Sequence, residues 1–181
     1  MPRHVAFLRG INVGGHRAES DQLRLCFQRL GFRDVATFRA SGNVIFAADR
    51  EPARELADRI EAALARSLGY AVPVFLRSAS SMRRIAEHEP FQSGVVEASR
   101  GKLQVMFLVA KPAATRRKEV LELASDEDRL AFAGSELYWL PSGGLRDSAL
   151  DLGAIERTLG PTTMRTKNTV DQIATKYLGG A

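Results

Sequence analysis

The sequence predicts an α+β fold built from two tandem ferredoxin-like βαββαβ halves packed into one compact unit. The same order of β-rich and helix-periodic segments occurs once before residue 92 and again after it. The runs Val5–Leu8 and Val105–Leu108 are apolar at every position, which is typical of strands covered on both faces. We therefore expect a first half with an extra helix over residues 1–92 and a second half with a C-terminal helix over residues 93–181.

The first half combines helical spacing of apolar residues with short β-rich runs. Small, turn-forming residues between two of these runs, from Ala40 to Asn43, predict a hairpin. Pro52 suits the first turn of a helix and Pro90 the end of another. The predicted elements are the strand Val5–Leu8, the helix Ser20–Leu30, the strands Val35–Arg39 and Val44–Ala48, the helix from Pro52 to Gly69, the strand Val72–Leu76 and the helix Ser80–Glu89.

The second half repeats this order. Its predicted elements are the strand Lys102–Val109, the helix Ala113–Ala124, the strands Arg129–Ala133 and Leu137–Leu140, the helix Ser148–Leu159, the extended segment Thr162–Thr166 and a final helix. That helix is predicted to open at Asn168, because asparagine is a good N-cap and Asp171 follows three residues later.

Composition narrows the functions that the chain can have. The 26 Lys and Arg residues exceed the 21 Asp and Glu residues by 5, a modest excess that hints at an anionic partner. Because the basic residues form no dense stripe, a solvated surface is the preferred interpretation of this excess. The single cysteine, Cys26, lies on an apolar helix face and is interpreted as buried packing. The three histidines lack further ligands at metal spacing, so we expect no metal and no cofactor.

Apolar segments are short throughout the chain. The N-terminal apolar run ends at Arg9, too early for a secretory signal, and the run at Val105–Ala110 is far below the roughly 20 residues of a membrane span. We expect a cytoplasmic protein without membrane contact, either a monomer or a homodimer.

Four segments carry a family resemblance. They are FLRGINVGG at Phe7–Gly15, SGNVIF at Ser41–Phe46, GGLRDSAL from Gly143 and TTMRTKNTV at Thr162–Val170. Together they resemble the recurring motifs of a bacterial family known as domain of unknown function 1697. The resemblance spans nearly the whole chain. It implies a fold, but no reaction, substrate or catalytic residues.

The glycines from Gly10 to Gly15 have the spacing of a phosphate-binding loop that follows a strand. His16 and Arg17 stand where that motif requires lysine and then serine or threonine, which argues against nucleotide hydrolysis. Two interpretations stay open. The loop is an anion nest to which Arg9 and Arg17 add charge, or it is a tight strand exit that needs glycine for its backbone conformation.

The predicted topology places polar residues at two sheet edges. In the first half, the exit of the first strand and the turn between the second and third strands are expected at one edge. In the second half, the exit of the third strand is expected beside the exit of the fourth. We expect Ser142 beside the second edge. The ligand-binding candidates are Arg9, Gly10, Asn12, Gly14, Gly15, Arg39, Ser41 and Asn43 at the first edge, and Gly143, Gly144, Arg146, Ser148, Arg165, Lys167 and Asn168 at the second.

These residues predict a module that binds a small anion carrying phosphate or carboxylate, because arginine and loop N–H groups are donors. An alternative is binding of RNA or single-stranded nucleic acid, because Phe7 and Phe46 loosely match base-stacking positions of ferredoxin-like sheets. A third is an enzyme with an unrecognised active site. No Ser/His/Asp order, paired carboxylates or Cys/His pair is evident, so no catalytic residue is named.

Overall fold

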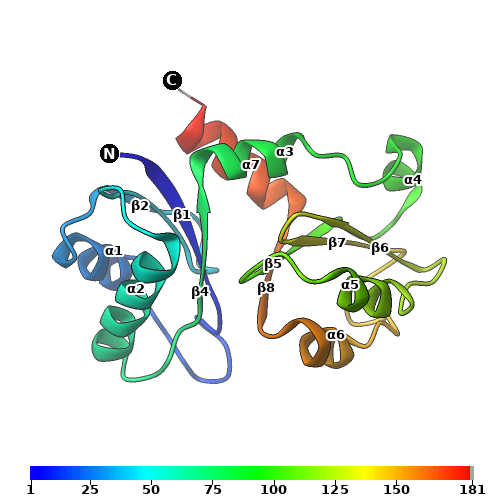
Figure 1. Ribbon diagram of the computed structural model, residues 1–181, viewed down its shortest axis with the longest axis horizontal. Helices are drawn as coiled ribbons and strands as arrows, with labels where there is room; N and C mark the ends of the chain where they lie inside the picture. The colour runs from blue at the N-terminus through cyan, green and yellow to red at the C-terminus, as the bar shows by residue number, and fades with distance from the viewer. Residues whose placement is uncertain (180–181) are drawn as a thin grey trace. The chain divides into compact units, whose positions relative to one another are not determined.

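The computed structural model describes residues 1–179 and is a mixed α+β structure, with two four-stranded antiparallel sheets and seven helices among those residues (Figure 1). The chain divides into two compact units. The first comprises Met1–Ile85 and the segment from Ile173 onward, and the second comprises Ala86–Gln172. The predicted halves, residues 1–92 and 93–181, are defined by the repeated order of strands and helices, whereas these two units are defined by compactness. The predicted boundary at residue 92 therefore stays a prediction.

The first sheet has the strand order β2-β3-β1-β4, and all neighbours are antiparallel. The elements are β1 (Arg3–Leu8), α1 (Ser20–Arg29), β2 (Arg33–Thr37), β3 (Asn43–Ala47), α2 (Ala53–Leu68), β4 (Val74–Ser78) and α3 (Ala79–Glu87). Because β3 lies between β1 and β2 and is antiparallel to both, β1 and β2 run parallel to each other. The end of β1 and the β2–β3 turn therefore share one sheet edge.

One face of the first sheet packs against α1 and α2, which lie on the same side of it (Figure 1). Phe46 contacts Phe32 in a stacked arrangement and Phe27 edge-on, with ring centroids 4.6 and 5.2 Å apart. Cys26 belongs to this core, so its prediction as buried packing is confirmed, and burial raises the pKa of its thiol. Leu56 of α2 is fully buried in the same layer.

The second sheet has the order β6-β7-β5-β8, again with antiparallel neighbours. The elements are α4 (Ser93–Ala98), β5 (Gln104–Leu108), α5 (Ala114–Leu121), β6 (Asp128–Ala133), β7 (Glu136–Pro141), α6 (Leu152–Leu159), β8 (Thr162–Thr166) and α7 (Lys167–Leu178). The helices α5 and α6 cover one face, and their Val120 and Ile155 pack with Met106 and Trp139 of the sheet.

Two predicted helix starts are wrong for the same reason, because nearby side chains cap the backbone elsewhere. The helix predicted from Ser148 begins at Leu152, after Asp151 accepts a hydrogen bond from the Ala154 N–H at 2.8 Å. The final helix begins at Lys167, so the predicted N-cap Asn168 lies within its first turn. The Thr166 hydroxyl accepts the hydrogen bond from the Thr169 N–H, at 3.2 Å.

Two further differences concern β4 and α4. The strand predicted at Val72–Leu76 lies two residues later, at Val74–Ser78. The helix α4 was not predicted, because six residues are too few to show a helical repeat. None of the helices formed by residues 1–179 is both long and apolar enough to cross a membrane.

Candidate functional site: two loop edges

The first edge consists of the loop 9–18 after β1 and the turn 38–42 between β2 and β3. Asn12 joins these segments. Its Nδ2 donates to the Ala40 carbonyl at 2.7 Å, and its Oδ1 accepts from the Ala18 N–H at 3.0 Å. The Leu8 N–H also donates to the Gly42 carbonyl at 2.8 Å. The predicted approach of Asn12 to this turn is therefore confirmed.

Two of the predicted ligand-binding residues hold the turn itself. Asn43 is fully buried, and its Nδ2 donates to the Phe38 carbonyl and to the Ser41 Oγ, both at 2.8 Å. The Phe38 N–H donates to the Asn43 carbonyl at 3.0 Å. The Asn43 amide thus orders the turn that carries Arg39.

The backbone of the first edge is left-handed at several positions. Gly10, Gly14 and Gly15 have φ of 74°, 62° and 89°, and a Cβ added at any of them would meet nothing within 4 Å. These glycines therefore serve the backbone conformation and leave open space above it. Asn12 and Arg39 adopt φ of 60° and 57°, a left-handed conformation that asparagine tolerates and that is uncommon for arginine.

The charge of the first edge is entirely positive. Residues 9–18 and 38–43 include Arg9, Arg17 and Arg39 and contain no Asp or Glu. Arg17 and Arg39 are exposed, and Arg9 is half-buried. The Arg39 guanidinium lies 5.4 Å from the centre of the Phe38 ring. Asn12 hydrogen-bonds the backbone of Ala18 and Ala40, which come immediately after Arg17 and Arg39 in the sequence. It therefore brings the two cations to one edge.

The second edge consists of the segment 99–103 before β5, the loop 142–148 after β7 and the start of α7. The Ser99 Oγ donates to the Pro141 carbonyl at 2.6 Å, and the Lys167 N–H donates to the Leu103 carbonyl at 2.8 Å. The exits of β7 and β8 therefore share this edge, with the entry of β5 between them. Sequence reasoning missed this entry segment, in which Gly101 packs against the end of β7.

Predicted residues of the second edge have structural partners. Burial lowers the pKa of Arg165 to about 10, and its Nη1 donates to the Thr163 hydroxyl at 2.9 Å. The Lys167 Nζ donates to the Ala86 carbonyl at 2.6 Å and to the Asp171 carboxylate at 2.7 Å. Both cations thus have interactions within the second unit.

A buried hydrogen-bond cluster supports the loop after β7. The Asp128 Oδ1 accepts from the Trp139 Nε1–H at 2.8 Å and from the Ser148 hydroxyl at 2.7 Å. Within the loop, the Asp147 N–H donates to the Gly144 carbonyl at 3.0 Å. Gly144 and Arg146 are exposed, Gly143 is half-buried and Asn168 is exposed at the start of α7.

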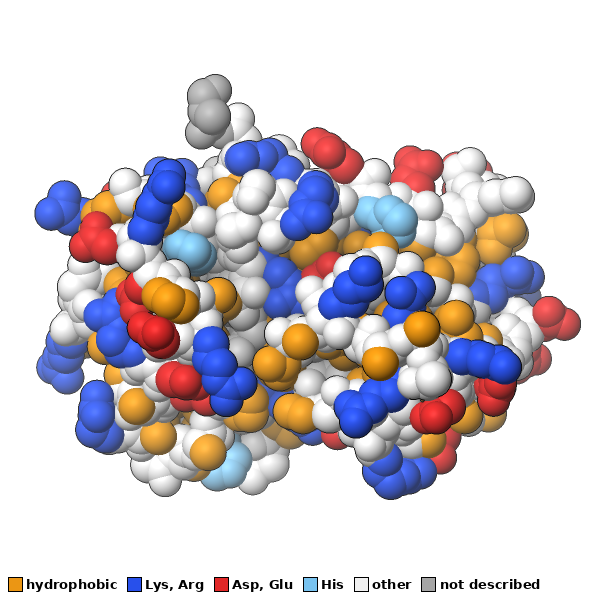
Figure 2. Space-filling view, viewed as in Figure 1, with side chains coloured by type: hydrophobic (Ala, Val, Ile, Leu, Met, Phe, Trp, Pro, Cys, Tyr) orange, Lys and Arg blue, Asp and Glu red, His pale blue; other side chains and the backbone are white. Residues whose placement is uncertain are grey.

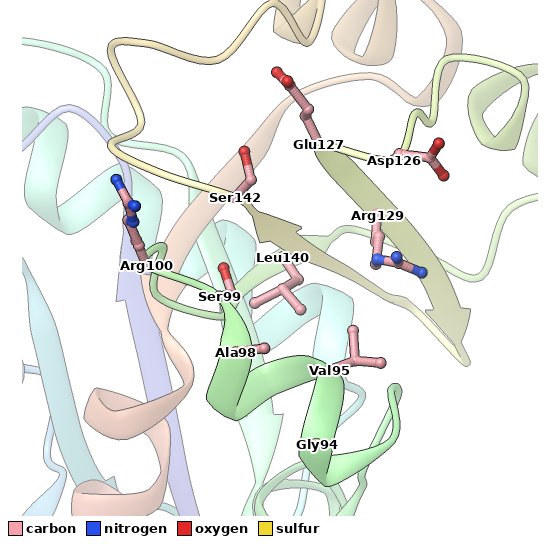
Figure 3. A pocket seen from close by; sticks show the side chains of 10 residues that line it. All are labelled: Gly94, Val95, Ala98, Ser99, Arg100, Asp126, Glu127, Arg129, Leu140 and Ser142. Carbon is pink, nitrogen blue, oxygen red and sulfur yellow. The ribbon is translucent and has the colours of Figure 1, made fainter.

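A cavity of about 370 Å³ lies in the second unit between α4, the start of β6 and the end of β7 (Figure 3). Ser142 is the residue of the predicted second edge that lines it. The other lining residues are Gly94, Val95, Ala98, Ser99, Arg100, Asp126, Glu127, Arg129 and Leu140. Neither α4 nor the Ser99–Gly101 segment had a helical or motif signal that could have found them from sequence.

The residues of the nucleic-acid alternative do not form a stacking platform. Phe46 packs in the helix-covered core, whereas Phe7 pairs with Asn43 on the opposite face, and both rings are fully buried. The Lys and Arg side chains on the face shown in Figure 2 are separated by acidic, apolar and neutral groups, with no continuous basic stripe among residues 1–179 there. Across the same described residues, no group of three or more His, Cys, Asp or Glu is placed to hold a metal ion.

The fold and the edges define an α+β protein with two four-stranded antiparallel sheets, each with polar loops at its strand exits. Residues 1–138 match the family described as Protein of unknown function (DUF1697), and the chain belongs to this family. It is also similar to the structure of a conserved bacterial protein from Streptococcus pneumoniae, with a TM-score of 0.74 and 18% identity over 99% of each chain. At that identity the likeness shows a common fold. The search among curated proteins gives no match.

Proposed function

We propose that this protein binds a small anion carrying phosphate or carboxylate at the first edge. The observation that carries the proposal is the double hydrogen bond of Asn12, which joins the glycine loop to the turn that bears Arg39. Guanidinium groups offer forked donors to such anions, and loop N–H groups add directed hydrogen bonds. The absence of Asp and Glu from residues 9–18 and 38–43 removes local repulsion.

The second edge fits a simple anion less well. It has Arg146 and three glycines, but Asp147 lies in the same loop, and the carboxylates of Asp126 and Glu127 line the adjoining cavity. The predicted anion-binding role of its residues therefore stays secondary to that of the first edge. Binding is proposed in preference to catalysis because the His16 imidazole of the first edge packs on the Tyr70 ring, with centroids 4.0 Å apart, and residues 9–18 and 38–43 contain no Asp or Glu that could orient it toward a nucleophile.

Titration with anions tests the proposal. The full-length protein is titrated with inorganic phosphate, pyrophosphate, sugar phosphates, nucleotides and small carboxylates at constant ionic strength, and its thermal midpoint is followed. A ligand that binds only the folded state raises this midpoint in proportion to the logarithm of its concentration. We expect a saturable response to at least one of them.

Matched charge variants locate the response. Arg17→Gln and Arg39→Gln each remove one exposed cation of the first edge, and Arg116→Gln removes an exposed cation of α5. The first two are expected to weaken the response about tenfold or more, since each loses a charge-assisted hydrogen bond, and the third leaves it unchanged. Equal responses in all three variants, or none from the unsubstituted protein, would overturn the proposal.

We further propose that residues 1–92 and 93–181 repeat one ferredoxin-like βαββαβ architecture. The two sheets have equivalent strand orders, supporting this interpretation. Further support comes from equivalent hydrogen bonds, Leu8 N–H to the Gly42 carbonyl and Leu108 N–H to the Ser135 carbonyl. In both halves a hydroxyl also caps the helix that follows the last strand, from Ser78 in one and Thr166 in the other.

A further inference from the structure

The cavity of the second unit is open to solvent, and its volume is that of a small-molecule site. Its volume of about 370 Å³ falls in the range of ligand cavities, roughly 300–1,000 Å³. Val95 and Ala98 of α4 and Leu140 of β7 supply apolar side chains to its lining, and they lie close together in Figure 3. Such a lining suits a short aliphatic group.

The walls of the cavity are held by hydrogen bonds to backbone carbonyls. The Ser99 Oγ bonds the Pro141 carbonyl at 2.6 Å, which holds the end of α4 against the end of β7. The Ser142 N–H donates to the Glu127 carbonyl at 2.7 Å, which holds the loop before β6 against the same strand. A cavity that already has its shape does not have to order its walls when a ligand binds.

Both signs of charge surround the apolar lining. Arg100 follows α4 and Arg129 lies on β6, whereas Asp126 and Glu127 precede β6. Figure 3 shows that these four side chains spread outward from the apolar group instead of pairing at its centre. Two guanidinium groups and two carboxylates balance, so the lining matches neither a simple anion nor a simple cation.

We propose that this cavity binds a free α-amino acid with an aliphatic side chain. The ligand carboxylate accepts hydrogen bonds from Arg129 or Arg100, and its ammonium group donates to Asp126 or Glu127. Its aliphatic side chain packs against Val95 and Leu140. This site uses other residues than the first edge, so it stands or falls independently of the function proposed there.

NMR titration of the full-length protein with L-leucine tests this proposal. The probes are the methyl groups of Val95 and Leu140, and the matched ligands are 4-methylpentanoate, which lacks the ammonium group, and 3-methylbutylamine, which lacks the carboxylate. We expect saturable shifts of these methyl signals with leucine and about tenfold weaker binding of each analogue, because a charge-assisted hydrogen bond is lost.

Charge variants provide a second measurement, the relative affinity for the three ligands. This ratio would not change if the substituted residues had only a structural role. Arg129→Gln is expected to weaken binding of leucine and 4-methylpentanoate but not of 3-methylbutylamine, and Asp126→Asn is expected to do the reverse for the two analogues. Both residues are exposed, so folding is expected to survive. Equal binding of all three ligands, no saturable shift with leucine, or no change in either variant would overturn the proposal.

Discussion

The two loop edges lie at opposite ends of sheets that share one strand order, and their chemical characters differ: the first is where β1 ends, and the second is where β5 begins. At the first edge, polar side chains such as Asn12 join exposed segments, and the surrounding charge is positive. At the second edge, Asp128 lies buried beneath the loop, and charges of both signs line a cavity. Topology therefore determines where strand exits meet, whereas the side chains and the segment that enters beside them determine what the edge can bind.

Gly14 of the first edge and Gly101 of the second have different roles. Gly14 supplies a left-handed backbone with open space around it. Gly101 does not have a positive φ, but a Cβ there would lie 2.0 Å from the Pro141 carbonyl oxygen. The first role is conformational, and the second is steric. Substitutions can separate these roles, beginning with the largest expected effect.

Gly101→Ala is expected to lower the free energy of unfolding by about 3 kcal/mol, because backbone must shift to admit the methyl group. The matched variant is Gly94→Ala in α4, where a Cβ meets nothing within 4 Å. That change is expected to be neutral or slightly stabilising, since alanine favours a helix. Urea unfolding measures both values, and equal values would contradict the steric role of Gly101.

Asp128→Ala and Asn12→Gly compare the hydrogen-bonding residue of each edge. The first variant leaves the Trp139 indole N–H without its acceptor in the interior, at an expected cost of about 2 to 3 kcal/mol. The second keeps the left-handed backbone and removes exposed hydrogen bonds, at a cost of about 1 kcal/mol.

Trp139 is the only tryptophan of the chain, so its fluorescence reports unfolding in both variants. In Asp128→Ala, the native emission is also expected to change because the indole N–H loses its partner. A cost at Asn12 as large as that at Asp128 would refute the difference between a buried and an exposed hydrogen-bonding residue.

Gly42→Ala and Gly14→Ala test two left-handed positions of the first edge. Gly42 has φ of 71°, and an added Cβ would lie 3.0 Å from the Leu8 Cβ. We expect it to cost about 2 kcal/mol, and Gly14→Ala about 1 kcal/mol from the backbone alone. Denaturant unfolding measures the difference, and a larger loss at Gly14 would argue that its loop makes contacts beyond its backbone conformation.

The smallest expected effect is the pH dependence that His4 gives to the first unit. Burial lowers the pKa of His4 below its usual 6.5, with a smaller opposing effect from Glu51. The unfolded chain then binds more protons than the folded one, so the free energy of unfolding declines as pH falls through 6.5 toward the folded-state pKa. His4→Gln is expected to flatten this decline. An equal slope in both proteins, measured by urea unfolding between about pH 7.5 and 5.5, would contradict the assignment.

Local patterns in the sequence predicted most strands and helices correctly because the burial of one face depends on residue spacing. Helix starts were less predictable. Ser148 and Asn168 are both plausible caps by residue type, yet Ser148 bonds Asp128 and the final helix starts before Asn168. A cap depends on which nearby backbone N–H its side chain reaches, which residue type alone does not specify.

The sequence by itself determined the alternation of strands and helices, the buried helix stripe that contains Cys26, and the meeting of Asn12 with the β2–β3 turn. Only the tertiary structure decided that Arg39 is left-handed, that Gly101 touches the end of β7, and that α4 closes one side of a cavity. The physical reason is the sequence distance over which each kind of interaction acts. Hydrophobic periodicity acts over a few neighbouring residues, whereas these features depend on strand register and on contacts between segments far apart in the chain.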